Sequence, residues 1–77
     1  MQKIDVYFEF GKRVAFLRKQ KGWSQEDLAL ESGIATSYLC EVEKGKRNPT
    51  LNVINRLAKA FGIKIEELFK GIDGDIG

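Results

Sequence analysis

The side chains in this sequence that could do chemistry are mostly cationic, and they are concentrated in the middle of the chain. Between Gly11 and Lys64 there are eleven lysines and arginines and five acidic residues, a net charge of +6. Residues 1–10 have a net charge of −1, and residues 65–77 have a net charge of −3. A basic centre between acidic ends favours binding of a polyanion. The alternative is that these charges only solvate the outer faces of helices.

The residues needed for metal binding or nucleophilic catalysis are scarce. The chain has one cysteine, Cys40, and no histidine. This composition argues against a zinc site, a Cys–His nucleophile and an internal disulfide. No second thiol could resolve an oxidised Cys40, so a small residue on an outward helix face explains it better than a redox sensor. We therefore expect no enzyme and no cofactor.

The length of 77 residues predicts a single domain that occupies residues 1–77. We expect an ordered core over residues 10–70 and a flexible, Gly- and Asp-rich tail over residues 71–77. No apolar run approaches the ~20 residues that span a bilayer, and no stretch has the layout of a signal peptide. A reduced, cytoplasmic setting without a membrane partner is expected.

The elements that must position these residues are predicted to be helices. Apolar residues recur at helical spacing from about Val6 or Phe10 to Lys21, although alternation over residues 4–8 also permits a short strand. The expected inward residues of this first helix are Phe10, Val14, Leu17 and Arg18. Gly22 follows its last turn, a usual place for a helix to end.

A second helix is predicted to begin after Ser24. Ser24 and Asp27 have the spacing of a capping box, in which each side chain bonds the other residue's backbone N–H. Trp23 precedes this start and faces Leu28 as in a hydrophobic staple. We interpret Trp23 as a core residue; the alternative is an aromatic side chain that stacks on a base.

The stretch from Gln25 to Lys44 has the pattern of a helix, a tight turn and a second helix. Ala29 is small enough for a second helix to cross nearby, and Gly33 can adopt the left-handed angles of a sharp turn. The apolar positions that complete the pattern are Leu28, Ile34, Leu39 and Val42. With these residues the sequence resembles the Cro and lambda-repressor-like (XRE-type) family of DNA-binding domains, over roughly Val14 to Phe69. An ordinary helical hairpin is the alternative interpretation.

This resemblance implies an all-α, five-helix, lambda-repressor-like domain whose partner is double-stranded DNA. The helix from about Thr36 to Lys44 would enter the major groove. The implied base contacts are Thr36, Ser37 and Glu41. The implied phosphate contacts are Gln25, Tyr38, Lys44, Lys46, Arg47 and Asn48. Alternatively, Gln25 is an ordinary first-turn polar residue, Tyr38 packs on the second helix, and residues 44–48 form a plain turn. An Arg18–Glu43 salt bridge is also implied.

Two departures from the family pattern affect the helix that is expected to enter the major groove. Ala35 occupies the N-cap position, so either Thr36 caps the helix or the helix begins uncapped, at a cost of about 1 kcal/mol. The base-reading positions include no Gln or Arg, so strong Arg-to-guanine readout from this helix is not available.

The remaining chain predicts two more helices and a dimer surface. Thr50 is the expected cap of a fourth helix that ends at Gly62, and a short fifth helix is expected from about Ile65 to Lys70. The predicted inward stripe of the fourth helix is Leu51, Ile54, Leu57, Ala58 and Phe61. The predicted dimer interface is Ile63, Ile65, Phe69 and Ile72, although Ile65 and Phe69 could simply complete the core.

The sequence therefore predicts a transcriptional regulator that binds an inverted-repeat operator as a homodimer, without a small-molecule ligand. Half-sites would lie about 34 Å apart. Small proteins of this kind resemble restriction–modification controllers, phage repressors or antitoxin autoregulators. The alternative function is a protein-interaction module or an antitoxin of the same fold, which the acidic Glu41 and the acidic C-terminal residues mildly favour.

Overall fold

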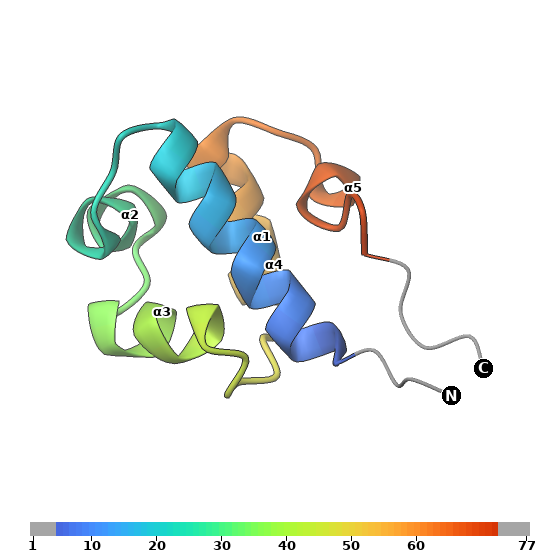
Figure 1. Cartoon of the computed structure of the whole chain (residues 1–77). Helices are drawn as coiled ribbons and strands as arrows, with labels where there is room; N and C mark the ends of the chain where they lie inside the picture. Colours follow the sequence, from blue (N-terminus) through green and yellow to red (C-terminus); the bar gives the residue numbers. More distant parts are fainter. Residues whose placement is uncertain (1–4, 73–77) are drawn as a thin grey trace.

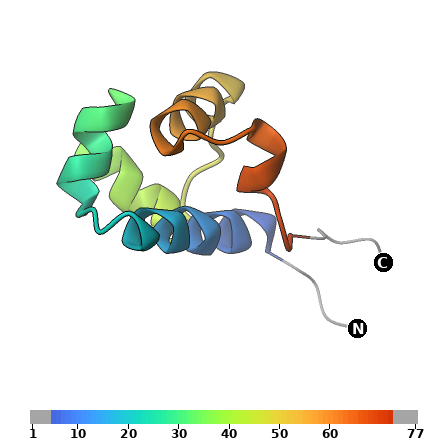
Figure 2. The same ribbon diagram turned by 90° about the horizontal axis from the view of Figure 1, so that it is seen from above.

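The computed structural model describes residues 5–72, which form five helices and no strand. The helices are α1 (Val6–Gln20), α2 (Gln25–Ser32), α3 (Thr36–Glu43), α4 (Leu51–Phe61) and α5 (Ile65–Leu68). Helices α2 and α3 lie on one side of α1 and α5 lies on the other, with α4 facing α1 (Figures 1 and 2). The prediction of an all-α, five-helix fold is confirmed. None of these helices is long and apolar enough to cross a membrane.

One hydrophobic core joins the five helices. Its most buried side chains come from every helix and include Val14, Leu28, Leu39, Leu57 and Leu68, all with an exposed fraction of 0%. Helix α3 packs against both α1 and α2, and α4 packs against α2 and α5. A chain of this length has a marginal core, so each of these contacts matters for stability.

The start of α1 shows that this segment is helical and not a strand. The Asp5 carboxylate accepts hydrogen bonds from the backbone N–H groups of Tyr7 and Phe8, both at 3.1 Å, and so caps the helix that begins at Val6. The strand alternative is therefore wrong for residues 5–8, and residues 1–4 lie outside the described part.

The starts of α2 and α3 differ in how they are capped. Ser24 and Asp27 form the predicted capping box at α2, with hydrogen bonds of 2.8 and 3.0 Å. Helix α3 begins at Thr36, and the Ala35 N-cap supplies no side-chain hydrogen bond. The uncapped start is therefore the alternative that the structure adopts, and Thr36 stays within the first turn of α3.

Three predictions at the C-terminal end of the chain need correction or completion. Leu51 is 81% exposed and not part of the inward stripe, because Ile54, one turn further on, already lies at the margin of the core. Helix α5 ends at Leu68, short of the predicted Lys70. The predicted start of the flexible tail at residue 71 is wrong, because Ile72 packs against the core. Residues 73–77 of that tail lie outside the described residues.

A glycine sets the distance between α1 and α3. Gly11 is buried where α1 crosses the end of α3, and its backbone lies directly against the main chain of Val42 and Glu43. A Cβ atom at Gly11 would clash with the Val42 carbonyl oxygen and would lie 2.8 Å from the Glu43 carbonyl oxygen. Since these are backbone atoms, neither can move aside without shifting a helix.

We predict that Gly11→Ala lowers the free energy of unfolding by about 1–3 kcal/mol, the usual cost of overpacking. On an open helix surface the same change would instead stabilise the protein by about 0.5–1 kcal/mol, so the sign of the effect tests the close crossing. Urea unfolding followed by circular dichroism provides the measurement, with Lys19→Ala on the exposed face of α1 as control. A stabilised Gly11→Ala variant would contradict the close packing.

Candidate nucleic-acid interface

Helices α2 and α3 are joined by a turn whose geometry is fixed by local hydrogen bonds. Gly33 ends α2 in the left-handed region with φ of 71°, and its N–H donates to the Ala29 carbonyl at 2.8 Å. The buried Ser32 hydroxyl donates to the Leu28 carbonyl at 2.7 Å and accepts from the Ile34 N–H at 3.3 Å. These hydrogen bonds fix the conformation of the turn that joins the two helices.

The outward face of α3 carries short side chains in its first turns. Leu39 and Val42 are buried against the core, which leaves Ser37 exposed and Thr36 and Cys40 half-buried on the surface. Such a surface lets a helix approach base edges closely, and hydroxyl groups can donate to or accept from them. The structure thus brings Thr36 and Ser37 together on one accessible turn.

Behind this face, a largely buried ion pair ties α3 to α1. The Arg18 guanidinium donates from Nε to Glu43 Oε2 at 2.7 Å and from Nη2 to Glu43 Oε1 at 3.0 Å. The two side chains are only 12% and 8% exposed. The hydrogen bond to Glu43 raises the pKa of Arg18 above its ordinary value, so the guanidinium keeps its charge. The salt bridge expected from the family resemblance is present.

The N-terminus of α2 joins the same network. Arg18 also donates from Nη1 to the Trp23 carbonyl at 2.8 Å, and the Gln25 side-chain amide donates to Glu43 Oε1 at 3.0 Å. The predicted phosphate ligand Gln25 therefore already uses one amide N–H within the protein. Its second N–H is the side-chain donor left for a phosphate.

The basic segment after α3 folds back on that helix. Lys44, Lys46 and Asn48 are exposed. The Lys46 backbone N–H donates to the Glu41 carbonyl at 2.9 Å, and Gly45 adopts φ of 77° where its backbone lies against Phe8. The cations of this segment are therefore held beside the end of α3, where a DNA backbone would pass if α3 lay in the major groove.

Glu41 is placed differently from the other predicted base contacts. Its carboxylate Oε1 accepts a hydrogen bond of 2.7 Å from Arg47 Nε, and the guanidinium lies over the Tyr38 ring at 5.2 Å from the centroid. The Glu41 and Arg47 side chains are 45% and 51% exposed. Three predicted DNA contacts, Tyr38, Glu41 and Arg47, thus form one cluster.

Trp23 packs within the fold. It is half-buried against the core and stacks on Phe61, with ring centroids 6.1 Å apart. The Lys21 ammonium group lies over the Trp23 ring. This arrangement matches the interpretation of Trp23 as a core residue and not the alternative of base stacking.

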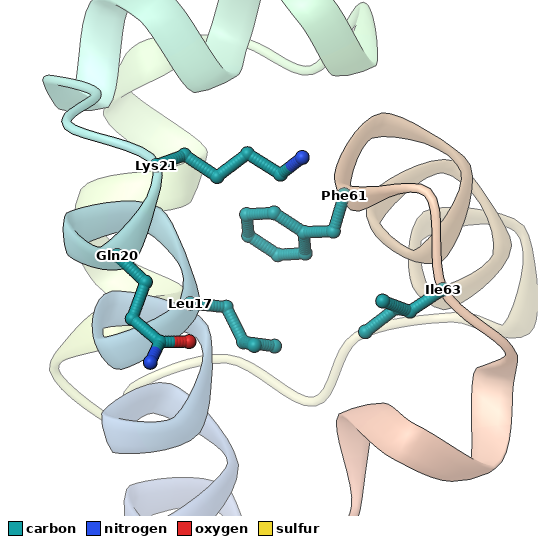
Figure 3. Close-up of a pocket in the computed structure, with 5 residues that line it drawn as sticks. All are labelled: Leu17, Gln20, Lys21, Phe61 and Ile63. Atoms are coloured by element: carbon teal, nitrogen blue, oxygen red, sulfur yellow. The ribbon is translucent and has the colours of Figure 1, made fainter.

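The residues predicted for a dimer interface lie on α5 and its flanking loops. Ile63, Phe69 and Ile72 are half-buried against the core, and Phe69 stacks on Phe10 with centroids 5.1 Å apart. Ile65 remains 44% exposed. Beside Ile63 is an open groove of about 530 Å³, into which Leu17, Phe61 and Ile63 point (Figure 3). The lining of the groove is completed by Gln20 and Lys21.

Comparison with known proteins identifies the family. The model of HTH_3, described as helix-turn-helix, matches residues 14–68. The chain belongs to the HTH_3 helix-turn-helix family. It is 40% identical over 70 residues to the HTH-type transcriptional regulator y4dJ of Sinorhizobium fredii, covering 91% of each chain. It is 34% identical to control protein C.MunI of a Mycoplasma species, covering 90% of this chain and 95% of that protein.

A solved structure of a similar protein shows the same fold. The restriction–modification controller protein C.AhdI from Aeromonas hydrophila is 48% identical to this chain, with a TM-score of 0.80. The alignment covers 82% of this chain and 96% of that one. The family and these relatives place the chain among DNA-binding transcription regulators.

Two contacts that hold parts of this fold together were not predicted from the sequence. The Glu41–Arg47 pair joins a helix to the following loop, and opposite charges six residues apart gave a weak signal because the path of the loop decides whether they meet. Arg13 donates from Nε and Nη2 to the Glu67 carbonyl at 3.1 and 2.9 Å and so holds α5 on α1. No sequence pattern marks a side chain that reaches a distant backbone carbonyl.

Two glutamates on α3 provide a matched test of the buried bridge. We predict that Glu43→Ala lowers the free energy of unfolding by about 3 kcal/mol or more, because it leaves the Arg18 charge buried without its partner. Glu41→Ala breaks an exposed pair and should cost less than about 1 kcal/mol. Urea unfolding of the two variants measures both values. Equal losses for the two variants would contradict a structural role for the Arg18–Glu43 pair.

Proposed function

We propose that this protein is a transcriptional regulator that binds an inverted-repeat operator as a homodimer, with α3 in the major groove. The observation that carries the proposal is the outward face of α3, where Thr36 and Ser37 lie accessible on the first turn. Short side chains at that end allow close approach, and their hydroxyl groups can distinguish base edges. In this proposal Thr36 and Ser37 read bases.

The cations beside α3 would supply the affinity that does not depend on sequence. Lys44, Lys46 and Asn48 are exposed in a segment held against the end of α3. Contacts from such side chains to phosphates orient a protein on the duplex, whereas sequence is read in the groove. Gln25 can add a phosphate contact at the N-terminus of α2 through the one side-chain N–H that Glu43 does not occupy.

Among the three biological contexts, similarity favours control of restriction–modification genes. Both C.MunI and C.AhdI are named as control or controller proteins, and this chain covers 95% and 96% of their lengths. We propose the same role here. Dimerisation is part of the proposal because one short reading helix spans too few base pairs to be specific, and two-fold symmetry matches an inverted repeat.

Selection from a random duplex library tests the proposed function directly. The wild-type protein should retain an inverted repeat with half-sites about one helical turn apart. Thr36→Ala should change the preferred base at one position of each half-site, with a loss of about 1–3 kcal/mol there. Retention without a motif would mean nonspecific binding. No retention at low salt would instead favour the protein-interaction module.

Lys46→Gln is the matched variant for a phosphate contact. It should weaken binding to every sequence alike and reduce the slope of log affinity against log salt by about one. It should leave the selected motif unchanged. If Thr36→Ala behaved in this way and Lys46→Gln altered the motif, the proposed reading face would be wrong.

The dimer surface is testable at its most exposed residue. We predict that Ile65→Glu converts a homodimer into a monomer. A two-fold axis brings the same patch of both subunits together, so two negative charges would meet in an apolar interface and repel each other. Sedimentation velocity measures the mass, and Leu30→Glu on α2, where Leu30 is 83% exposed, is the control. Loss of the dimer in the control only, or a monomeric wild-type protein, would contradict the proposed interface.

A further inference from the structure

We propose that Glu41 acts as a positioning residue for Arg47, and that DNA recognition uses the pair in place of a direct base contact from Glu41. This inference rests on the proposed function, and it assigns to Glu41 a role different from the one that the family resemblance implies. It depends on three contacts that converge at the end of α3.

The first two contacts fasten residues 46 and 47 to the same glutamate. The Glu41 carbonyl accepts from the Lys46 backbone N–H at 2.9 Å, and the Glu41 carboxylate accepts from Arg47 Nε at 2.7 Å. The main chain and a side chain of the loop are thus both held by Glu41. The third contact is with Tyr38, one turn earlier on α3, whose ring lies 5.2 Å from the guanidinium carbon.

The geometry leaves the outer end of the Arg47 guanidinium available. Arginine has five N–H donors, and Glu41 uses the one on Nε. The four donors on the two Nη atoms lie at the tip of a side chain that is 51% exposed. Such a fork can bind a phosphate or the edge of guanine with two hydrogen bonds. Glu41 therefore orients the cation without occupying its outer edge.

Holding a long side chain in place before binding also reduces the cost of binding. An arginine side chain loses much rotamer freedom when it is ordered. If that ordering takes place only on binding, it lowers the affinity of the complex. The same contact removes a difficulty with Glu41 itself. A free carboxylate on a surface that faces phosphates would repel them, whereas a carboxylate paired with Arg47 is locally neutralised.

The sign of the effect of Glu41→Ala separates the possible roles. If Glu41 were only a surface acid, its removal would strengthen DNA binding by reducing repulsion. If it positions Arg47, its removal should weaken binding to the selected operator by about two- to fivefold, the range that one exposed ion pair supports. This loss should disappear when Arg47 is already replaced.

The experiment is a double-mutant cycle on the full chain. Wild type, Glu41→Ala, Arg47→Gln and the double variant are titrated onto the selected operator duplex and onto a scrambled duplex, with fluorescence anisotropy as the readout. Glu31→Ala removes the same charge from the exposed end of α2 and controls for general electrostatics. Glu41→Gln keeps an acceptor oxygen for Arg47 Nε and should restore part of the lost affinity. Circular dichroism checks that each variant is folded.

Four outcomes decide the proposal. A loss of operator affinity in Glu41→Ala that vanishes in the Arg47→Gln background supports it. An equal loss in both backgrounds would show that Glu41 acts independently of Arg47 and would overturn the proposal. Tighter binding by both Glu41→Ala and Glu31→Ala would make Glu41 a surface acid and also overturn it. A wild-type protein that binds neither duplex would overturn the proposed function, and this inference with it.

Discussion

The placement of α3 depends on the largely buried ion pair between Arg18 and Glu43. Two hydrogen bonds of 2.7 and 3.0 Å between Arg18 and Glu43 fix the end of α3 to α1. Arg18 also donates to the Trp23 carbonyl just before α2, and Glu43 accepts from the side-chain amide of Gln25, the first residue of α2. One cluster therefore sets the orientation of three helices. A buried pair of this kind requires satisfied hydrogen bonds, since an unpaired charge would destabilise the fold.

The close crossing at Gly11 works together with this cluster. Without a side chain there, the backbone of α1 can lie directly against the carbonyl groups of Val42 and Glu43. The carbonyl of Glu43 is thus packed on α1 at one point while its carboxylate is bonded to Arg18 at another. Both contacts act on the C-terminal turn of α3, which leaves the first turn, with Thr36 and Ser37, accessible on the surface.

Features encoded by nearby residues could be predicted from the sequence. The Ser24–Asp27 capping box, the Gly33 turn and the helical periodicity of the core depend on fixed spacings, and the structure contains them. Leu51 has the correct spacing but lies one turn beyond the core. Helical periodicity predicts which side of α4 faces the other helices, but not how far along α4 those helices extend. The Glu41–Arg47 and Arg13–Glu67 contacts depend on how loops and helices meet, which spacing does not encode.

The two glutamates of α3 leave little unpaired negative charge on that helix. Each carboxylate is bonded to an arginine, Glu43 to Arg18 inside the fold and Glu41 to Arg47 at its surface. The formal negative charge of the helix is therefore compensated locally, and the exposed Lys44 and Lys46 add positive charge near its end. The two arginines differ in what they can do afterwards. Arg18 is enclosed and structural, whereas Arg47 keeps its outer edge in solvent, where a nucleic acid can reach it.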